Sequence, residues 1–228
     1  DDMNIKCMYH FENVAKLNLF TEILEKTRWN IEKQLLKERA VYYASNHFYN
    51  ELKKQFIRND LTIWPLKDEE VITWIDTLSI MRRVMMQLFK KGINGEKLNV
   101  FMEYPLVYGN HMRADYLIVY ERLIIVLEFG MFNQDEKRSE ERYTKKLQDS
   151  ITHRQVLANV MDNTIKVVNY VMIYRPEFDR LRNSFLNENI IYNNEEIKLL
   201  TSFIINMTRD EEKLSAISQL ERVNQLNL

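Results

Sequence analysis

Apolar residues recur every three or four positions along most of the chain, and this pattern predicts helices on both sides of one central group of strands. Helical spacing predicts two or three helices within 14–58, one within 68–91, one from about 140 to 162, and two more at 195–207 and 210–226. Alternating or continuous apolar runs predict strands at 100–107, in a hairpin at 113–130 and at 165–174. The charged residues 133–138 are expected to form a loop.

The central elements therefore follow the order helix, strand, strand, strand, helix, strand. An α/β sandwich around a small mixed sheet accommodates this order. We expect three parts: an N-terminal helical annex at 1–62, a core at 63–180 and a C-terminal helical annex at 181–228.

Composition limits the class of protein. Of the 228 residues, 46% are hydrophobic, which is enough for a packed core. Lys and Arg (32) nearly balance Asp and Glu (33), so nucleic-acid binding would require a local basic patch. The single cysteine, Cys7, argues against a disulfide and a zinc site and favours a reducing, cytoplasmic setting. Because no apolar run approaches the roughly 18 residues of a membrane span, we expect a soluble protein without membrane contact.

Two carboxylates interrupt the apolar hairpin. Asp115 enters the first strand and Glu128 lies near the end of the second, and a turn at Glu121-Arg122 places the two acids opposite each other, about 5 Å apart between Cβ atoms. Two acids this close repel each other unless a cation lies between them, and carboxylate oxygens suit Mg²⁺ or Mn²⁺. The alternative is a hairpin whose acids reach solvent or pair with Arg113.

Three short segments of the predicted core resemble the PD-(D/E)XK nuclease superfamily: Phe101-Met102-Glu103-Tyr104, Arg113-Ala114-Asp115 and Val126-Leu127-Glu128-Phe129. They are also similar to the nuclease-like region that precedes the helicase domain in some bacterial and phage ATPases. The resemblance covers about residues 65–176 and implies a restriction-endonuclease-like α-β-β-β-α-β core. It implies a metal-dependent hydrolase acting on DNA or RNA, an ATPase or helicase as partner, and a phage or defence setting.

The resemblance also implies roles for individual residues. Asp115 and Glu128 correspond to the metal-binding carboxylates, and the carbonyl of Phe129 corresponds to a further ligand. Glu103 is either an additional acid of the site or an exposed strand-edge residue. Gly130 stands where the superfamily has a lysine that positions or deprotonates the attacking water, and glycine can do neither.

The helix predicted at 140–162 offers two replacements for that lysine. Because helices at this place in the superfamily sometimes carry a migrated lysine, the resemblance implies Lys145 as the first choice and Lys146, on a neighbouring stripe with His153, as the substitute. Gln148 and Gln155 share the stripe of Lys145. These two glutamines, together with Arg113, are the expected contacts to a nucleic-acid backbone. The alternative is a solvated helix face. On the preceding helix, Glu70 and Asp76 are weaker candidates for the site.

Three functions remain open at this point. The first is a metal-dependent nuclease that acts on DNA or RNA. The second, motivated by Gly130 and the near-zero net charge, is an inactive nuclease fold that binds nucleic acid or a partner protein. The third is a homo-oligomerisation domain built on the Met- and Tyr-rich helices.

Overall fold

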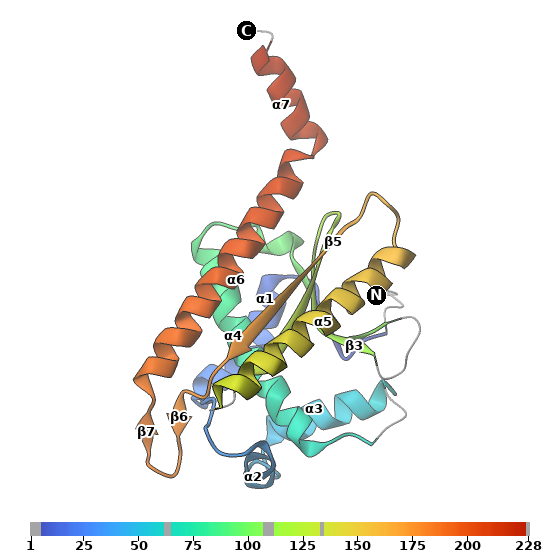
Figure 1. Ribbon diagram of the computed structural model, residues 1–228. Coiled ribbons are helices and arrows are strands. Elements are labelled where there is room, and N and C mark those ends of the chain that lie inside the picture. Colours follow the sequence, from blue (N-terminus) through green and yellow to red (C-terminus); the bar gives the residue numbers. More distant parts are fainter. Residues whose placement is uncertain (1–5, 62–64, 107–111, 133–134, 227–228) are drawn as a thin grey trace.

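A mixed five-stranded sheet forms the centre of the protein in the computed structural model, which describes residues 6–61, 65–106, 112–132 and 135–226 (Figure 1). The strands lie side by side in chain order: β1 (Tyr9–Phe11), β2 (Asn99–Pro105), β3 (Arg113–Tyr120), β4 (Leu123–Met131) and β5 (Lys166–Tyr174). The pairs β1–β2, β2–β3 and β3–β4 are antiparallel, whereas β5 runs parallel to β4. A parallel pair needs a crossover connection, and the helix α5 (Glu136–Val160) supplies it.

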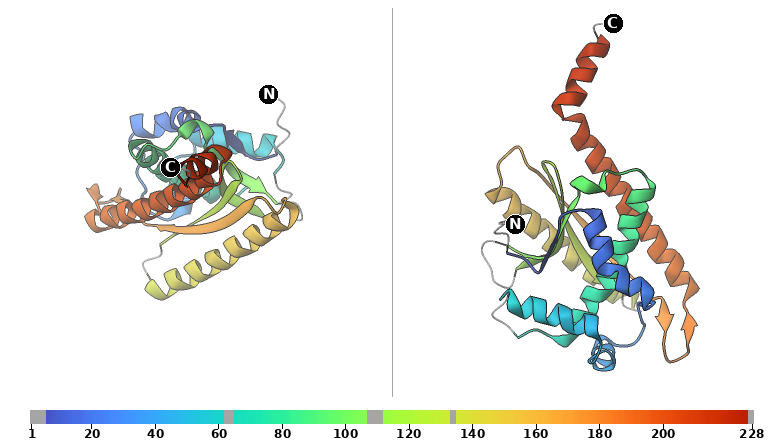
Figure 2. Two further views of the ribbon diagram at one scale, coloured as in Figure 1. Left: turned by 90° about the horizontal axis from the view of Figure 1, so that it is seen from above. Right: turned by 180° about the vertical axis from the view of Figure 1, so that it is seen from behind.

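Helices cover both faces of this sheet (Figure 2). One face carries α4 (Asp68–Lys90), with α1 (Val14–Lys26) and α6 (Asn187–Lys213) beside it, and the other face carries α5. The short helix α2 (Leu36–Tyr42) and α3 (His47–Arg58) pack against α4. The remaining elements are a 3-10 turn (Gly95–Lys97), a two-stranded sheet of β6 (Phe178–Asp179) and β7 (Ser184–Phe185), and α7 (Ala216–Leu226). None of the helices in the described residues is long and apolar enough to cross a membrane.

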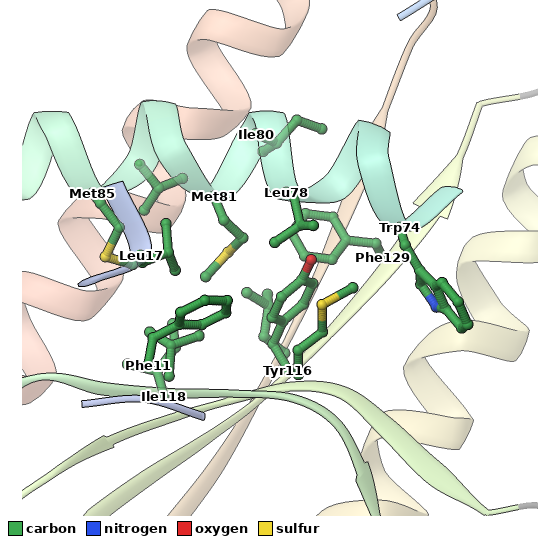
Figure 3. Close-up of a cluster of buried hydrophobic side chains, with 14 of the residues drawn as sticks. Phe11, Leu17, Trp74, Leu78, Ile80, Met81, Met85, Tyr116, Ile118 and Phe129 are labelled. Carbon is green, nitrogen blue, oxygen red and sulfur yellow. The ribbon is translucent and has the colours of Figure 1, made fainter. Parts of the chain in front are cut away.

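The main hydrophobic core lies between α4 and the sheet (Figure 3). Leu78 and Met81 of α4 are fully buried there, beside Tyr116 and Ile118 of β3. Burial of each large aliphatic side chain contributes roughly 1.5–3 kcal/mol, so this face alone contributes much of the stability. A smaller cluster, which includes Leu157 of α5, lies on the opposite face of the sheet.

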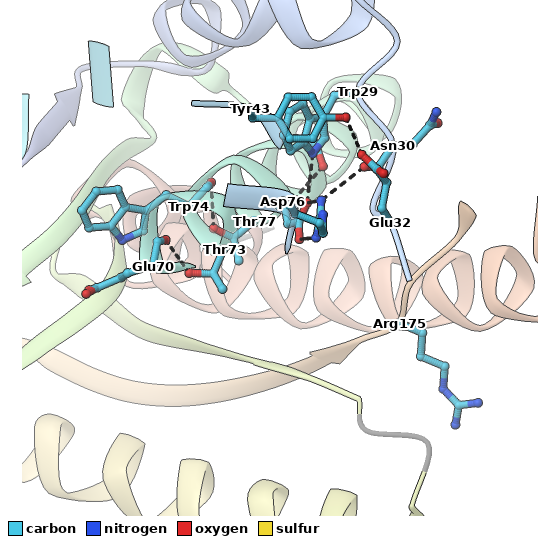
Figure 4. A network of polar contacts seen from close by, with 12 residues as sticks. Trp29, Asn30, Glu32, Tyr43, Glu70, Thr73, Trp74, Asp76, Thr77 and Arg175 are labelled. Carbon is cyan, nitrogen blue, oxygen red and sulfur yellow. Dashed lines mark hydrogen bonds and ion pairs between the residues drawn. The ribbon is translucent and has the colours of Figure 1, made fainter. Parts of the chain in front are cut away.

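A buried polar network ties the N-terminal helices to α4 (Figure 4). Arg39 of α2 and Asp76 of α4 have fully buried side chains and form a two-pronged ion pair, with N–O distances of 2.7 and 2.8 Å. The indole N–H of Trp29 donates to the same carboxylate at 2.9 Å. Removing one partner of such a pair typically costs about 3–5 kcal/mol, because the other charge stays buried without compensation. Asp76, a weaker candidate for the site, therefore has a structural role as the partner of Arg39 and Trp29.

Most of the predicted elements are confirmed. The helix 68–90 ends at a left-handed Gly92, and Tyr120 pairs with Leu123 across the turn, which is the hairpin register predicted from sequence. The loop predicted for the charged residues 133–138 is wrong in part. Asp135 accepts hydrogen bonds from the N–H groups of residues 137 and 138, so α5 begins at Glu136. The boundary predicted between helices at 195–207 and 210–226 is wrong, because α6 begins already at Asn187 and continues to Lys213, and α7 begins at Ala216. Val107 and residues 133–134 lie outside the described residues.

The short strands β1, β6 and β7 were not predicted. Each has two or three residues, too few for an alternating pattern to be recognised. β1 extends the sheet beside β2, so a segment of the expected N-terminal annex contributes to the central sheet.

Candidate functional site

The alternation of side chains along β2 breaks at Glu103. Met102 packs in the main core on the α4 face, whereas Tyr104 packs on the opposite cluster, although regular alternation along a strand would place residues two apart on the same face. Glu103 between them has a φ of 52°, a left-handed conformation that costs a non-glycine residue on the order of 1–3 kcal/mol. Asp115 lies at the same level of β3, between residues paired with Met102 and Tyr104. The sheet is thus distorted where two acids meet.

Asp115 and Glu128 are linked across β3 and β4 by reciprocal hydrogen bonds. The N–H of Asp115 donates to Glu128 Oε2 at 3.3 Å, and the N–H of Phe129 donates to Asp115 Oδ2 at 2.9 Å. The backbone pairing of the two strands ends one step earlier, at Tyr116 and Leu127. Side-chain carboxylates therefore replace the backbone ladder at this point and hold the two acids beside each other.

The acid pair carries more negative charge than its surroundings readily accommodate. Glu128 is only 2% exposed, and burial raises the pKa of its carboxyl group well above the ordinary value. The neighbouring Asp115 carboxylate raises the pKa of Glu128 further, while Lys146 opposes the shift. Repulsion of this kind is relieved by a proton or by a cation held between the two groups.

Lys146 of α5 is the cation whose charge opposes the raised pKa of Glu128. Asp115 raises the pKa of Lys146 above its ordinary value, burial opposes that shift, and Glu128 adds to it. The position of the Lys146 stem is informative, because a Cβ atom at Gly130 would lie 3.6 Å from Lys146 Cγ. The helical lysine thus passes next to the place where a side chain at position 130 would begin.

His153 of α5 holds the second oxygen of Glu128. Its Nδ1 lies 2.5 Å from Glu128 Oε1, and which atom carries the proton depends on the imidazole tautomer. Burial lowers the pKa of His153, so the imidazole is neutral around pH 7 and acts as a hydrogen-bonding partner. The Glu128 carboxyl group is in this way fixed from both sides, by the backbone of Asp115 and by His153.

A second chain of charges runs from Glu103 to α4 through Arg113. The Arg113 guanidinium bonds Glu103 at 2.7 Å and Glu70 at 2.8 Å, and it lies over the ring of Phe56. Burial raises the pKa of Glu103 to about 8, and the Asp115 carboxylate adds to this, although Arg113 opposes it. Burial likewise raises the pKa of Glu70. Both glutamates therefore belong to the same electrostatic cluster as Asp115.

The remaining sequence candidates lie elsewhere. Lys145 and Gln148 line a shallow surface depression of α5 with Glu140 and Asp149. Gln155 is exposed on the side of α5 opposite Lys146. Arg113, expected to contact nucleic acid, is committed to its two glutamates, and its side chain is only 13% exposed. The structure thus brings Lys146, rather than Lys145, to the acids.

The donor atoms suit a hard divalent cation with a partial protein shell. No three His, Cys, Asp or Glu side chains among the described residues come close enough together to hold a metal alone. Mg²⁺ commonly binds through one or two carboxylates and keeps several waters, and Asp115, Glu128 and the Phe129 carbonyl offer such a set. The closeness of the two carboxyl groups, joined by reciprocal hydrogen bonds across β3 and β4, is the observation that favours a cation there.

Sequence reasoning missed the contribution of His153 and undervalued Glu70. The signal for His153 was present, because Lys146, Ser150, His153 and Leu157 follow one another at spacings of four, three and four and so share one helix face. Ser150 and Leu157 are buried, which identifies this stripe as the one facing the sheet. Helical spacing of the apolar residues would also turn Tyr143 and Val160 inward, but both are 43% exposed.

Comparison of the chain with protein-family models, with curated proteins and with solved structures gives no match. A functional assignment therefore rests on the geometry of the acids, Lys146 and His153.

Proposed function

We propose that the protein is a metal-dependent phosphodiesterase of the PD-(D/E)XK type, acting on DNA or RNA, in which Lys146 takes the part of the missing motif lysine. The observation that carries this proposal is the position of Lys146. Its Cγ lies 3.6 Å from where a Cβ of residue 130 would be, and Asp115 and Glu128 both raise the pKa of its amine. An amine that approaches from α5 can therefore reach the region that a lysine at position 130 would serve.

The order of elements supports the same proposal. The series α4, β2, β3, β4, α5, β5 corresponds to the α-β-β-β-α-β core of a restriction-endonuclease-like fold, with the first acid at the start of β3 and the second near the end of β4. Fold similarity alone does not establish chemistry, so the assignment depends on what the side chains at this place can do.

Each residue of the site has a part in the proposed reaction. Asp115, Glu128 and the Phe129 carbonyl would hold Mg²⁺ or Mn²⁺, which when bound would lower the pKa of a water and stabilise negative charge on the phosphate. Lys146 supplies a fixed positive charge beside the phosphate and a hydrogen-bond donor for the attacking water. His153 keeps Glu128 in one orientation. Arg113 holds Glu103 and Glu70 in place and partly offsets their charge.

Cleavage of labelled single- and double-stranded DNA and RNA in Mn²⁺ tests the proposal. We expect metal-dependent products from the unmodified protein and a loss of about 10³-fold or more in rate for the double variant Asp115→Ala, Glu128→Ala. Equal rates for the unmodified protein and this double variant would contradict the proposal.

An inactive nuclease fold is the second candidate. It is favoured by the hydrogen bonds that already engage Glu128 Oε1 and Oε2 and Asp115 Oδ2. Isothermal titration with Mn²⁺ separates the two candidates. Binding that disappears in the Asp115→Ala, Glu128→Ala variant supports the enzyme, whereas no binding by the unmodified protein supports the inactive fold.

A further inference from the structure

A cavity of about 1020 Å³ lies next to the candidate site, at the ends of β4 and β5. We name it the basal cleft and define it by Lys33, Lys37, Phe132, Arg142, Leu186 and Asn187, which are among its lining residues. Figure 1 shows α2 and the first turns of α5 and α6 gathered at this lower end of the molecule. The volume is at the upper end of the range of pockets for small ligands, roughly 300–1,000 Å³.

The basal cleft lies close to the proposed active site along the chain and through Arg142. Phe132 lies two residues after Gly130, just beyond the end of β4, and a Cβ at Gly130 would lie 3.9 Å from Arg142 Cδ and 3.6 Å from Lys146 Cγ. Arg142 also donates to the carbonyl of Met131 at 2.8 Å, which fixes it at this end of the strand. At 3.3 Å per residue, Phe132 lies about 13 Å from Glu128, a span of roughly four nucleotides in a stacked strand.

The charges of the basal cleft suit a polyanion. Lys33 and Lys37 are exposed, and neither they nor Arg142 form an ion pair with another described residue. Glu188 is the one acid among the residues that line the cavity. The first turn of the long helix α6 also opens here, and its N-cap residue Leu186 provides no side-chain acceptor for the N–H groups of that turn.

Apolar residues form part of the wall of the basal cleft. Leu35, Leu36, Met131, Pro176 and Leu186 contribute to them, as does Phe132, whose ring lies 3.9 Å from the guanidinium carbon of Arg175. Figure 4 shows that Arg175 points away from the buried network around Asp76. Apolar and aromatic surface next to unpaired cations is the combination that binds exposed bases together with their phosphates. A duplex hides its bases and offers mainly phosphates.

We infer that the basal cleft binds unpaired nucleotides of the substrate strand, a few nucleotides from the bond to be cleaved. The inference rests on the proposed function, and it specifies the substrate as single-stranded nucleic acid or a frayed end. Lys33 and Lys37 contact phosphates, and the apolar wall receives the bases. The shared chemistry does not distinguish DNA from RNA, so both are tested.

Fluorescence anisotropy in EDTA tests binding separately from cleavage. The probes are a labelled 12-nucleotide DNA, the same sequence as RNA, and a blunt 12-base-pair duplex. The variant is Lys33→Ala, Lys37→Ala, and its matched control is Lys90→Ala, Lys91→Ala, which removes the same charge from the exposed end of α4. Thermal melting of both variants confirms that each is folded.

The unmodified protein is expected to prefer a single strand to the duplex. Loss of Lys33 and Lys37 should weaken single-strand binding about tenfold and reduce the slope of log K against log salt by about 1.4, as for two lost phosphate contacts. Equal affinities in the cleft and control variants would overturn the inference, and so would no binding by the unmodified protein. Displacement of the DNA by poly-glutamate of equal charge as effectively as by unlabelled DNA would identify an acidic protein as the occupant instead.

The outcome for the basal cleft is independent of the outcome for catalysis. Cleavage by the unmodified protein, with equal binding by the cleft and control variants, would reject the cleft and keep the nuclease. Lysine-dependent single-strand binding without any Mn²⁺-dependent cleavage would keep the cleft as a nucleic-acid site and reject the nuclease.

Discussion

Two clusters of buried charge in this protein differ in how their charges balance. In the network around Asp76, the cations Arg39 and Arg180 face the acids Asp76 and Glu32, so positive and negative groups are equal in number. In the site around Asp115, the four acids Glu70, Glu103, Asp115 and Glu128 face the two cations Arg113 and Lys146. A balanced cluster serves the fold, and an unbalanced one stores charge that a ligand can neutralise.

The largest expected effect concerns stability in the balanced cluster. Asp76→Ala leaves the fully buried Arg39 without its carboxylate and should lower the free energy of unfolding by about 3–5 kcal/mol. Denaturant unfolding followed by circular dichroism measures this value. Glu22→Ala, which breaks the exposed ion pair with Lys26, serves as the control and should have no measurable effect. Similar losses in both variants would remove the distinction between the buried network and the surface.

The next effect concerns catalysis in the unbalanced cluster. Lys146→Ala should reduce the rate of Mn²⁺-dependent cleavage by about 10²–10³-fold, because the transition state loses a charged donor beside the acids. Lys145→Ala is a closely matched control, since the neighbouring lysine on the same helix is exposed. Single-turnover rates measure both. A larger loss for Lys145→Ala than for Lys146→Ala would contradict the role assigned to Lys146.

The unbalanced cluster should also make stability depend on pH. Burial raises the pKa of Glu103 from its ordinary 4.5 to about 8, so the folded state keeps a proton that the unfolded chain releases. Over this window the folded state binds more protons, and the free energy of unfolding therefore falls as the pH rises from 4.5 to about 8. Glu103→Gln keeps an acceptor for Arg113 and removes the titration, so it should remove a decline of roughly 1.4 kcal/mol per pH unit within this window.

Urea unfolding in EDTA at several pH values between 5 and 8 measures this slope. Identical slopes in the unmodified protein and Glu103→Gln would contradict the assignment. A repeat with Mg²⁺ sharpens the comparison between clusters, since a cation bound at Asp115 and Glu128 at 100 times its Kd would stabilise the protein by about 2.7 kcal/mol. The Asp115→Ala, Glu128→Ala variant should show no such gain.

The fold was accessible from the sequence because its elements are long and periodic. Helix α4, the hairpin of β3 and β4, and β5 each repeat one apolar pattern over many residues, and the turn at Glu121-Arg122 determines the register that opposes Asp115 to Glu128. The pattern did not reveal the left-handed backbone of Glu103, which places Met102 and Tyr104 on opposite faces of the sheet. Glu103 contacts Arg113 on the neighbouring strand, and a contact of this kind leaves no periodic signal in the sequence.

The choice between adjacent lysines shows the same limit for the candidate site. Lys145 and Lys146 differ by one residue, which is about 100° around a helix, and the polar stripe through Lys145 looked more coherent in sequence than the stripe through Lys146. The buried Ser150 and Leu157 decide the orientation, because they face the sheet together with Lys146. Small buried serines carry little hydrophobic signal, so tertiary packing determined what periodicity left open.

The smallest expected effect is a partial rescue that tests whether Lys146 and position 130 serve the same place. In the Lys146→Ala background, Gly130→Lys should recover about tenfold in cleavage rate, an effect of about 1.4 kcal/mol. The recovery is incomplete because a Cβ at position 130 would lie only 2.6 Å from Ile173 Cδ1. Ile173→Val removes that methyl group, at a cost of about 0.5–1.5 kcal/mol in stability, and should increase the recovery.

Gly130→Ala in the Lys146→Ala background is the control for this rescue, because it adds the Cβ without the amine. If the amine is what the site lacks, only the lysine variants regain activity, and their gain requires Asp115 and Glu128. Equal activity of the alanine and lysine variants at position 130 would show that an amine from β4 cannot replace one from α5. The unbalanced acids would then depend on the particular approach of Lys146, and the parallel with the PD-(D/E)XK lysine would fail at the residue that carries it.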